Sequence, residues 1–277
     1  MTSSSGGSGG SGGVATGGGG SGGSAGSLGG SGGTAGASGS AGSGGDVGGG
    51  AGSGGSSQNP EGVPANYTLL LDEPFSSADA LNSILQGNPG GWTFDAADGG
   101  SLAFAATGYT APAPVNESLS SFAIISTVKF SSFVLEVEFL NTGANAADPH
   151  RDSCIVFNAV SETQFLYAHI AQTHDERSHN IHLIDNAPRE PLTEMDNGGI
   201  QWGDTWHKVR LTRDAVSGAV AVYWDDDLST PILTATTTAF TEGYIGFGTY
   251  LDGGKVRNLK IWAESSVSMP ADGFFGD

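Results

Sequence analysis

Four of the chain's six histidines lie within fourteen positions, from His169 to His182. The other two members of this group are His174 and His179. Imidazole rings at this density can bind a metal ion, exchange protons with a substrate or line a ligand groove. The role open to each ring depends on where its side chain points, and that direction follows from the surrounding secondary structure.

The segments on either side of the histidine group have the composition of β-strands. Residues 165–171 (FLYAHIA) and 180–185 (NIHLID) are short, apolar and rich in aromatic and β-branched side chains. The polar segment 172–179 between them is typical of a loop. We therefore expect a hairpin, with His174 and His179 in its loop.

Alternation along these two strands predicts one shared face of polar and aromatic side chains, opposite the core. Its members are Tyr167, His169, Asn180 and His182. Rings offer flat apolar surface to a sugar, and imidazole and amide groups offer hydrogen bonds to its hydroxyls. Arg151 and Arg189 flank the strands and are expected at the rim of such a groove. The alternative is an ordinary solvated sheet face.

Metal binding is the third possibility for these residue types. Zinc requires three or four converging ligands, and no HExxH or CxxC pattern supplies partners for His169 and His182. Calcium prefers oxygen ligands, for which Asp225, Asp227 and Asp252 are the candidates. Consecutive aspartates after a strand also occur in plain turns. No cofactor other than calcium is expected.

The elements that must position these residues are strands. Short apolar runs separated by Gly, Pro, Asn and Asp recur along residues 66–264, and helical periodicity is confined to residues 77–86. In the run FVLEVEFL, Phe133, Leu135, Val137 and Phe139 share one face, which is expected to face the core. The pattern predicts an all-β fold, an antiparallel sandwich of about a dozen strands.

Residues 1–60 are dominated by glycine and serine, and Asp46 is their one charge before Gln58. Such a segment cannot bury enough apolar surface to fold, and is predicted to be a disordered tether with a reach of about 40 Å. Residues 265–277 are predicted to be a flexible tail. No apolar run is long enough to span a membrane, and no signal peptide is visible.

The net charge of −19 argues against nucleic acid and anionic membrane as partners, because both require clustered Lys and Arg. The single cysteine, Cys154, lies in a core-like strand and is expected to be a buried thiol. The long tether favours display outside the cell or attachment to its surface, with a cytoplasmic location as the alternative.

Three features of the sequence carry a resemblance to a known fold family. They are the strand WHKVRL (206–211), the hairpin GAVAVYWDD (218–226) and a final pair of strands, IGFGTY (245–250) and VRNLKI (256–261). In this order they resemble the concanavalin A-like lectin/glucanase jelly roll. They are similar in particular to laminin-G-like domains and to the bacterial 3-keto-disaccharide hydrolase domain family. The resemblance implies a module that binds a polysaccharide or glycan on its concave sheet face. The same fold also hosts glycan-processing enzymes and adhesion domains without a sugar site.

Two enzyme mechanisms follow from the resemblance. Lyases of this fold abstract a proton with Tyr or His, roles that Tyr167 and His169 would fill, although the negative charge disfavours an anionic substrate. Family 16 glucanases carry the pattern E-[aliphatic]-D-x-x-E. Here that stretch begins at Glu136, has Glu138 in place of Asp and ends at Asn141, so one catalytic acid is missing.

Overall fold

The computed structural model of the protein describes residues 58–106, 109–115, 119–143 and 150–276. The predicted tether lies outside these residues, apart from 58–60. Regular structure in the described part is almost entirely β-sheet, as predicted, with two short 3₁₀ helices, η1 (Ala78–Ser83) and η2 (Ala97–Gly99). No helix in these ranges has the length and apolar character needed to cross a membrane.

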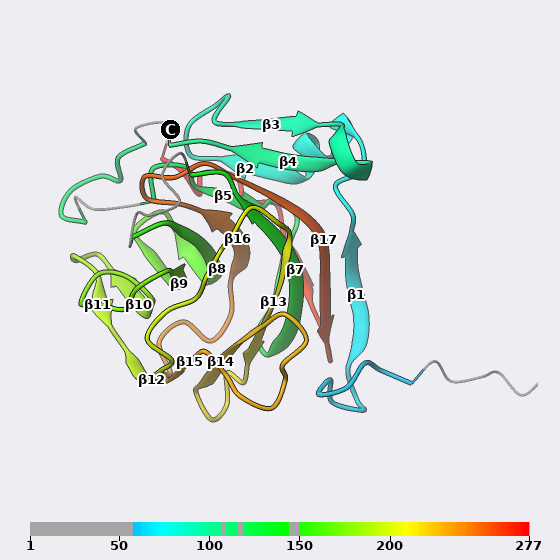
Figure 1. Ribbon diagram of the computed structural model, residues 1–277, viewed down its shortest axis with the longest axis vertical. Helices are drawn as coiled ribbons and strands as arrows, with labels where there is room; N and C mark the ends of the chain where they lie inside the picture. The colour runs from blue at the N-terminus through cyan, green and yellow to red at the C-terminus, as the bar shows by residue number, and fades with distance from the viewer. Residues whose placement is uncertain (1–57, 107–108, 116–118, 144–149, 277) are drawn as a thin grey trace, which may run out of the picture. The chain divides into compact units, whose positions relative to one another are not determined.

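Two large antiparallel sheets contain most of the eighteen strands found in the described residues (Figure 1). The first sheet has the spatial order β12 (Thr193–Asp196), β15 (Leu233–Thr236), β14 (Ala219–Trp224), β13 (His207–Arg213), β7 (Phe133–Asn141), β17 (Gly254–Ala263), β4 (Ser101–Phe104) and β3 (Trp92–Asp95), and β1 (Thr68–Glu73) also pairs with β17. The second sheet has the order β11 (Glu190–Pro191), β10 (Asn180–Asp185), β9 (Gln164–Ala171), β8 (Asp152–Ser161), β16 (Tyr244–Gly248), β5 (Ala123–Ile125) and β2 (Ile84–Gln86). A small separate ribbon joins β18 (Val267–Ser268) to β6 (Val128–Lys129).

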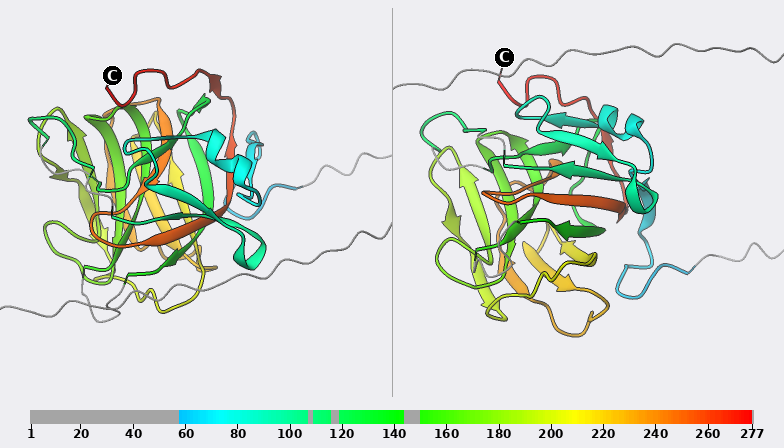
Figure 2. Two further views of the ribbon diagram at one scale, coloured as in Figure 1. Left: turned by 90° about the horizontal axis from the view of Figure 1, so that it is seen from above. Right: turned by 45° about the horizontal axis from the view of Figure 1, so that its top comes forward.

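The two sheets pack face to face, as the two views of Figure 2 show, and one large apolar core lies between them. Along β7, every second side chain from Phe133 to Phe139 is buried in this core. Phe139 meets Phe247 of the opposite sheet edge to face, with ring centroids 5.7 Å apart. The predicted all-β fold, an antiparallel sandwich, is confirmed, and so is the core-facing row of β7.

Two buried arginine–asparagine pairs join the sheets through hydrogen bonds. Arg151, just before β8, donates from Nε to Oδ1 of Asn141 at the end of β7, at 2.7 Å. Arg213 on β13 donates from Nε to Oδ1 of Asn158 on β8, at 2.9 Å. Both guanidinium groups also bond to backbone carbonyls, at 2.6 Å for Arg151 and 2.7 Å for Arg213. Neutral oxygens thus satisfy most of the donors that these buried cations bring between the sheets.

The outer face of the second sheet is buried as well, which the alternation pattern does not reveal. A second apolar cluster covers it, formed by β8, β9 and β16 together with the segment before β5 and the C-terminal residues. Cys154 and Tyr167 lie in this cluster with no solvent exposure. The thiol is therefore buried, as predicted, but the second apolar cluster covers much of the sheet face that was expected to form a ligand groove or, alternatively, to be solvated.

The C-terminal residues supply much of this cover, so the prediction of a flexible tail from residue 265 is wrong for the described part, up to 276. Phe274 is 5% exposed and meets Phe122 edge to face at a centroid distance of 5.9 Å. Phe275 packs on the same ring at 5.1 Å. Two adjacent aromatic side chains bury enough apolar area to hold the end of the chain against the sheet.

Removal of one of these rings should therefore destabilise the domain. We expect Phe274→Ala to lower the free energy of unfolding by about 3–4 kcal/mol, because it opens a cavity between Phe122 and the sheet. Urea unfolding of the full chain, followed by tryptophan fluorescence, measures the change. Val216→Ala, at a side chain that is 90% exposed, is the control and should shift it by less than about 0.5 kcal/mol. Equal stability of both variants would show that the C-terminal residues do not cover the sheet.

Candidate functional site

A cavity of about 580 Å³ opens on the outer face of the second sheet, beside the second apolar cluster. It lies where β8 begins and β9 ends, and the segments before β5 and β8, between β9 and β10, between β10 and β11, and after β16 complete its walls. The lining residues are Tyr109, Thr110, Ser120, His150, Asp152, His169, Asp175, Arg177, Ser178, Arg189, Tyr250, Leu251 and Asp252. Asp152 and His169 are buried and form its floor, whereas Arg177 and Leu251 are exposed at its mouth.

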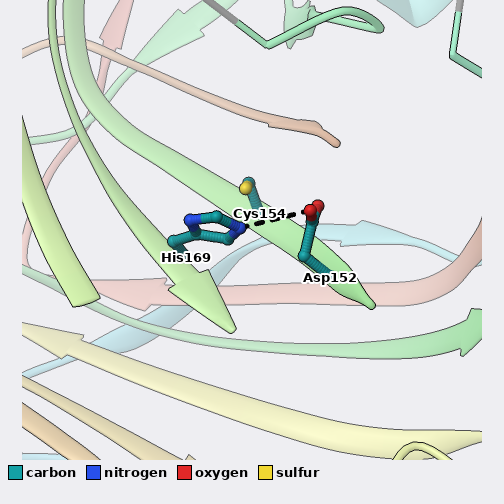
Figure 3. A group of neighbouring side chains, drawn as sticks. All are labelled: Asp152, Cys154 and His169. Carbon is teal, nitrogen blue, oxygen red and sulfur yellow. Dashed lines mark ion pairs between the residues drawn. The ribbon is translucent and has the colours of Figure 1, made fainter. Parts of the chain in front are cut away.

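The carboxylate of Asp152 is the best-held group of the floor. Its Oδ1 accepts hydrogen bonds from the Thr249 hydroxyl at 2.9 Å and from the Tyr250 backbone N–H at 3.1 Å. Its own backbone N–H donates to Oδ2 of Asp252 at 2.7 Å. The other carboxylate oxygen, Oδ2, lies 3.3 Å from Nε2 of His169 (Figure 3). Asp152 therefore connects the start of β8 to the loop that follows β16.

The ring of His169 is fixed on two sides. Its Nδ1 is 2.8 Å from the backbone carbonyl of Arg177, which accepts a hydrogen bond, so Nδ1 carries the proton. Its face stacks on Tyr250 at a centroid distance of 5.1 Å. The guanidinium of Arg189 lies 4.6 Å from the centroid of the same tyrosine ring. His169 and Arg189 thus both line the cavity, and both contact the ring of Tyr250.

Tyr167 and His182 are paired as the alternation predicts, but both are fully buried. His182 lies opposite Tyr167 in the β9–β10 register, and the rings stack at 4.9 Å. The Tyr167 hydroxyl bonds to that of Tyr250 at 2.6 Å. Burial raises the pKa of Tyr167 well above its usual range, which keeps its hydroxyl protonated. Neither side chain lines the cavity, so they support its wall from behind.

The side chains of Asn180 and Arg151 donate hydrogen bonds to backbone carbonyls. Asn180 is 2% exposed, and its amide donates to the carbonyls of Asp175 at 2.5 Å and Ser178 at 3.1 Å, which shapes the loop between β9 and β10. Arg151 is 1% exposed and is held by Asn141, so it lies outside the cavity lining instead of at its rim. Side chains alternate along the chain, and Asp152 takes the cavity-facing position next to it.

The calcium candidates are divided between two places. Asp225 accepts from His207 at 3.1 Å and Asp227 from Ser229 at 2.6 Å, both in the turn after β14. Asp252 lines the cavity instead. In the described residues, the group of three or more His, Cys, Asp or Glu side chains close enough to share an ion is Asp152, Cys154 and His169. Calcium binding at the predicted aspartates stays a prediction.

The two glutamates of β7 form ion pairs on the outer face of the first sheet. Glu136 pairs with Arg210 at 2.5 Å, and Glu138 pairs with Arg257 at 2.7 Å. Arg257 in turn lies over the ring of Trp206, 4.0 Å from its centroid. Both glutamates are thus bound in ion pairs on a different sheet from the cavity, in agreement with the missing catalytic acid in their motif.

The local sequence does not predict that several of the lining residues belong to the cavity. Tyr250 and Asp252 reach the cavity because β16 pairs with β8, although about ninety residues separate the two strands. Tyr109 comes from the segment before β5, and its hydroxyl bonds to the carboxylate of Glu162. The run GTYLDGG after β16 carries turn signals, but its place beside Asp152 follows from the strand order alone.

No family model and no curated protein matches the sequence. Among solved structures, the chain is similar to carbohydrate-binding module CBM66 from Bacillus subtilis (14% identity, 65% of this chain and 96% of that chain, TM-score 0.48). It is also similar to arcelin-5, a lectin-like defence protein from Phaseolus vulgaris (13% identity, 74% and 100%, TM-score 0.47). A third is domain 4 of AbnA, a GH43 extracellular arabinanase from Geobacillus stearothermophilus (11% identity, 76% and 97%, TM-score 0.44). These are similarities of fold.

The buried histidines predict a loss of stability in acid. Burial lowers the pKa of His182 to about 3 and lowers the pKa of His179 below its usual value of 6.5. Between pH 6.5 and 3 the unfolded chain binds protons that the folded chain does not, so the free energy of unfolding falls as the pH falls through this window. Urea unfolding at a series of pH values should show the decline, and His182→Phe should make it shallower. Val216→Ala, at an exposed side chain that does not titrate, is the control and should leave the slope unchanged. An unaltered slope for His182→Phe would contradict the burial of a neutral imidazole.

Proposed function

We propose that the domain binds a neutral carbohydrate in the cavity floored by Asp152 and His169. The observation that carries this proposal is the mixture of charges in the lining. Three carboxylates, from Asp152, Asp175 and Asp252, share the lining with the guanidinium groups of Arg177 and Arg189. A sugar hydroxyl both donates and accepts, so it matches a wall on which acceptors and donors lie side by side.

The size and position of the cavity agree with such a ligand. Its volume of about 580 Å³ lies within the range of small-molecule sites. Leu251 is 84% exposed at the mouth and offers apolar surface to the C–H groups of a sugar ring. The ring of Tyr250 already contacts His169 and Arg189, so this ring is a wall and not a stacking platform. A polyanionic ligand is disfavoured by the net charge of −19.

We further propose that the Gly/Ser-rich segment before residue 58 displays the domain at a cell surface or outside the cell. Its composition, with one charge and no aromatic residue, supports a tethering role. Cell fractionation with an antibody against residues 58–276 tests this location. Recovery of the protein in the cytoplasmic fraction alone would refute it.

Glycan binding can be tested at the mouth of the cavity, where substitutions should leave the fold intact. We expect Arg177→Ala and Leu251→Ala each to weaken binding by about tenfold or more, because each removes a contact with the ligand at the cavity mouth. Native affinity electrophoresis through gels cast with neutral and acidic polysaccharides identifies the ligand class, and calorimetry with its oligosaccharides measures the affinity.

The matched controls are Lys208→Ala and Val216→Ala, a surface cation and an exposed apolar side chain outside the cavity lining. Both should bind like the wild type. If no neutral polysaccharide retards the wild-type chain, the proposal fails. If the control variants lose binding as much as the cavity variants do, the ligand lies elsewhere on the domain. Loss of the polysaccharide along the track of the protein in the gel would identify a glycan-cleaving enzyme.

A further inference from the structure

Three side chains with metal-binding atoms converge at the cavity floor through the register of two strands. Cys154 on β8 and His169 on β9 are direct cross-strand partners, and Asp152 lies two residues before Cys154 on the same face. One ligand atom from each lies within 4.8 Å of the others (Figure 3). All three side chains are buried, with at most 3% of any of these residues exposed.

The orientation of His169 presents a lone pair to a carboxylate. Because Nδ1 donates to the Arg177 carbonyl, the neutral ring has its lone pair on Nε2. This atom is buried, makes no hydrogen bond to any described group and lies 3.3 Å from Oδ2 of Asp152. Two electron-rich atoms so close in a dry site repel each other unless a proton or a metal cation lies between them.

The distance favours the metal over the proton. A charge-assisted hydrogen bond from imidazolium to carboxylate is shorter, at about 2.7–2.9 Å. In a tetrahedral zinc site, with bonds of about 2.0–2.1 Å to nitrogen and oxygen, the two ligand atoms are about 3.3 Å apart. The observed separation of 3.3 Å is the tetrahedral one. Cys154 then supplies the third ligand, a thiolate sulfur that suits zinc.

Hydrogen bonds from neighbouring groups hold two of these side chains in place, as they hold the ligands of a metal site. The Arg177 carbonyl holds the ring of His169, and Thr249 and the Tyr250 amide hold the other oxygen of Asp152. Such outer contacts orient ligands and leave their binding atoms directed inward. Asp152 and His169 line the cavity while Cys154 lies behind them, so an open coordination position would face the cavity.

We propose that Asp152 Oδ2, Cys154 Sγ and His169 Nε2 bind a zinc ion. The fourth position takes water or an oxygen of a cavity ligand. Binding converts the Cys154 thiol to a thiolate and releases its proton to solvent. The site does not depend on carbohydrate binding.

Cobalt(II) is the probe, because a cobalt–thiolate bond gives a charge-transfer band in the near ultraviolet. The sequence has a single cysteine, so such a band reports on Cys154 alone. The full chain, freed of metal by dialysis against a chelator, is titrated with Co²⁺ and then with Zn²⁺. We expect one equivalent of Co²⁺ with the thiolate band, its displacement by Zn²⁺, and release of one proton for each zinc bound.

Variants assign the remaining ligands. His169→Gln and Asp152→Asn should each weaken Zn²⁺ binding by more than about 100-fold, since loss of a ligand exceeds loss of an outer contact. Arg177→Ala is the matched control: it removes a side chain of the cavity lining but keeps the carbonyl that holds His169. It should bind zinc like the wild type while losing glycan affinity, which separates this proposal from the proposed function.

The wild-type titration alone can overturn the proposal, even if a variant fails to fold. Absence of a thiolate band, or zinc binding without proton release, would show that Cys154 is no ligand. A wild-type chain that takes up no Co²⁺, with His169 doubly protonated by nitrogen NMR, would leave an imidazolium–carboxylate pair as the explanation. Tight zinc binding by His169→Gln would place the ion elsewhere.

Discussion

A buried carboxylate organises this end of the sandwich. Asp152 is 3% exposed, and an ionised group so far from water costs several kcal/mol unless its surroundings compensate. Thr249 and the Tyr250 amide provide hydrogen bonds, and they come from the loop after β16. The backbone carbonyl of Asp152 accepts from the Asn141 amide at 2.6 Å, which ties β8 to β7 of the opposite sheet. The cavity exists where these requirements bring three separate segments together.

The second constraint is that β8 is covered on both faces. Ile155 and Phe157 face the core between the sheets, while Cys154 and Val156 face the second apolar cluster. In most antiparallel sandwiches one face of each sheet is in water. Here the C-terminal residues and the segment before β5 cover the outer face of the second sheet beside the cavity, and Asp152 and His169 on the cavity floor are buried. Interactions of Asp152 and His169 are correspondingly stronger than they would be on an open sheet.

Burial keeps four of the side chains behind the cavity uncharged at neutral pH. Burial keeps His179 and His182 neutral and the hydroxyls of Tyr167 and Tyr250 protonated. Their role is to fix the rings and hydrogen bonds behind the cavity. The groups left to act on a ligand are those of the lining, where carboxylate and guanidinium groups face the same space as the imidazole of His169.

Much of the local structure could be predicted from the sequence, because the alternation of side chains along a strand has a two-residue period that is visible in the sequence. The core-facing row of β7 and the opposition of Tyr167 to His182 both follow from that period and from the polar loop between β9 and β10. The thiol of Cys154 was expected to be buried for the same reason, and it is. Alternation assigns side chains to faces, and these assignments are confirmed.

What covers each face was decided only by the tertiary structure. Polar side chains such as His169 and Asn180 indicated a wet face, yet Phe274 and the segment around Phe122, distant in the sequence, cover much of that sheet. The placement of Tyr250 beside Asp152 likewise depends on the pairing of β16 with β8. The sequence by itself determined the strands and their faces, since those depend on neighbouring residues. Burial and the cavity depend on contacts between remote segments, which local periodicity does not encode.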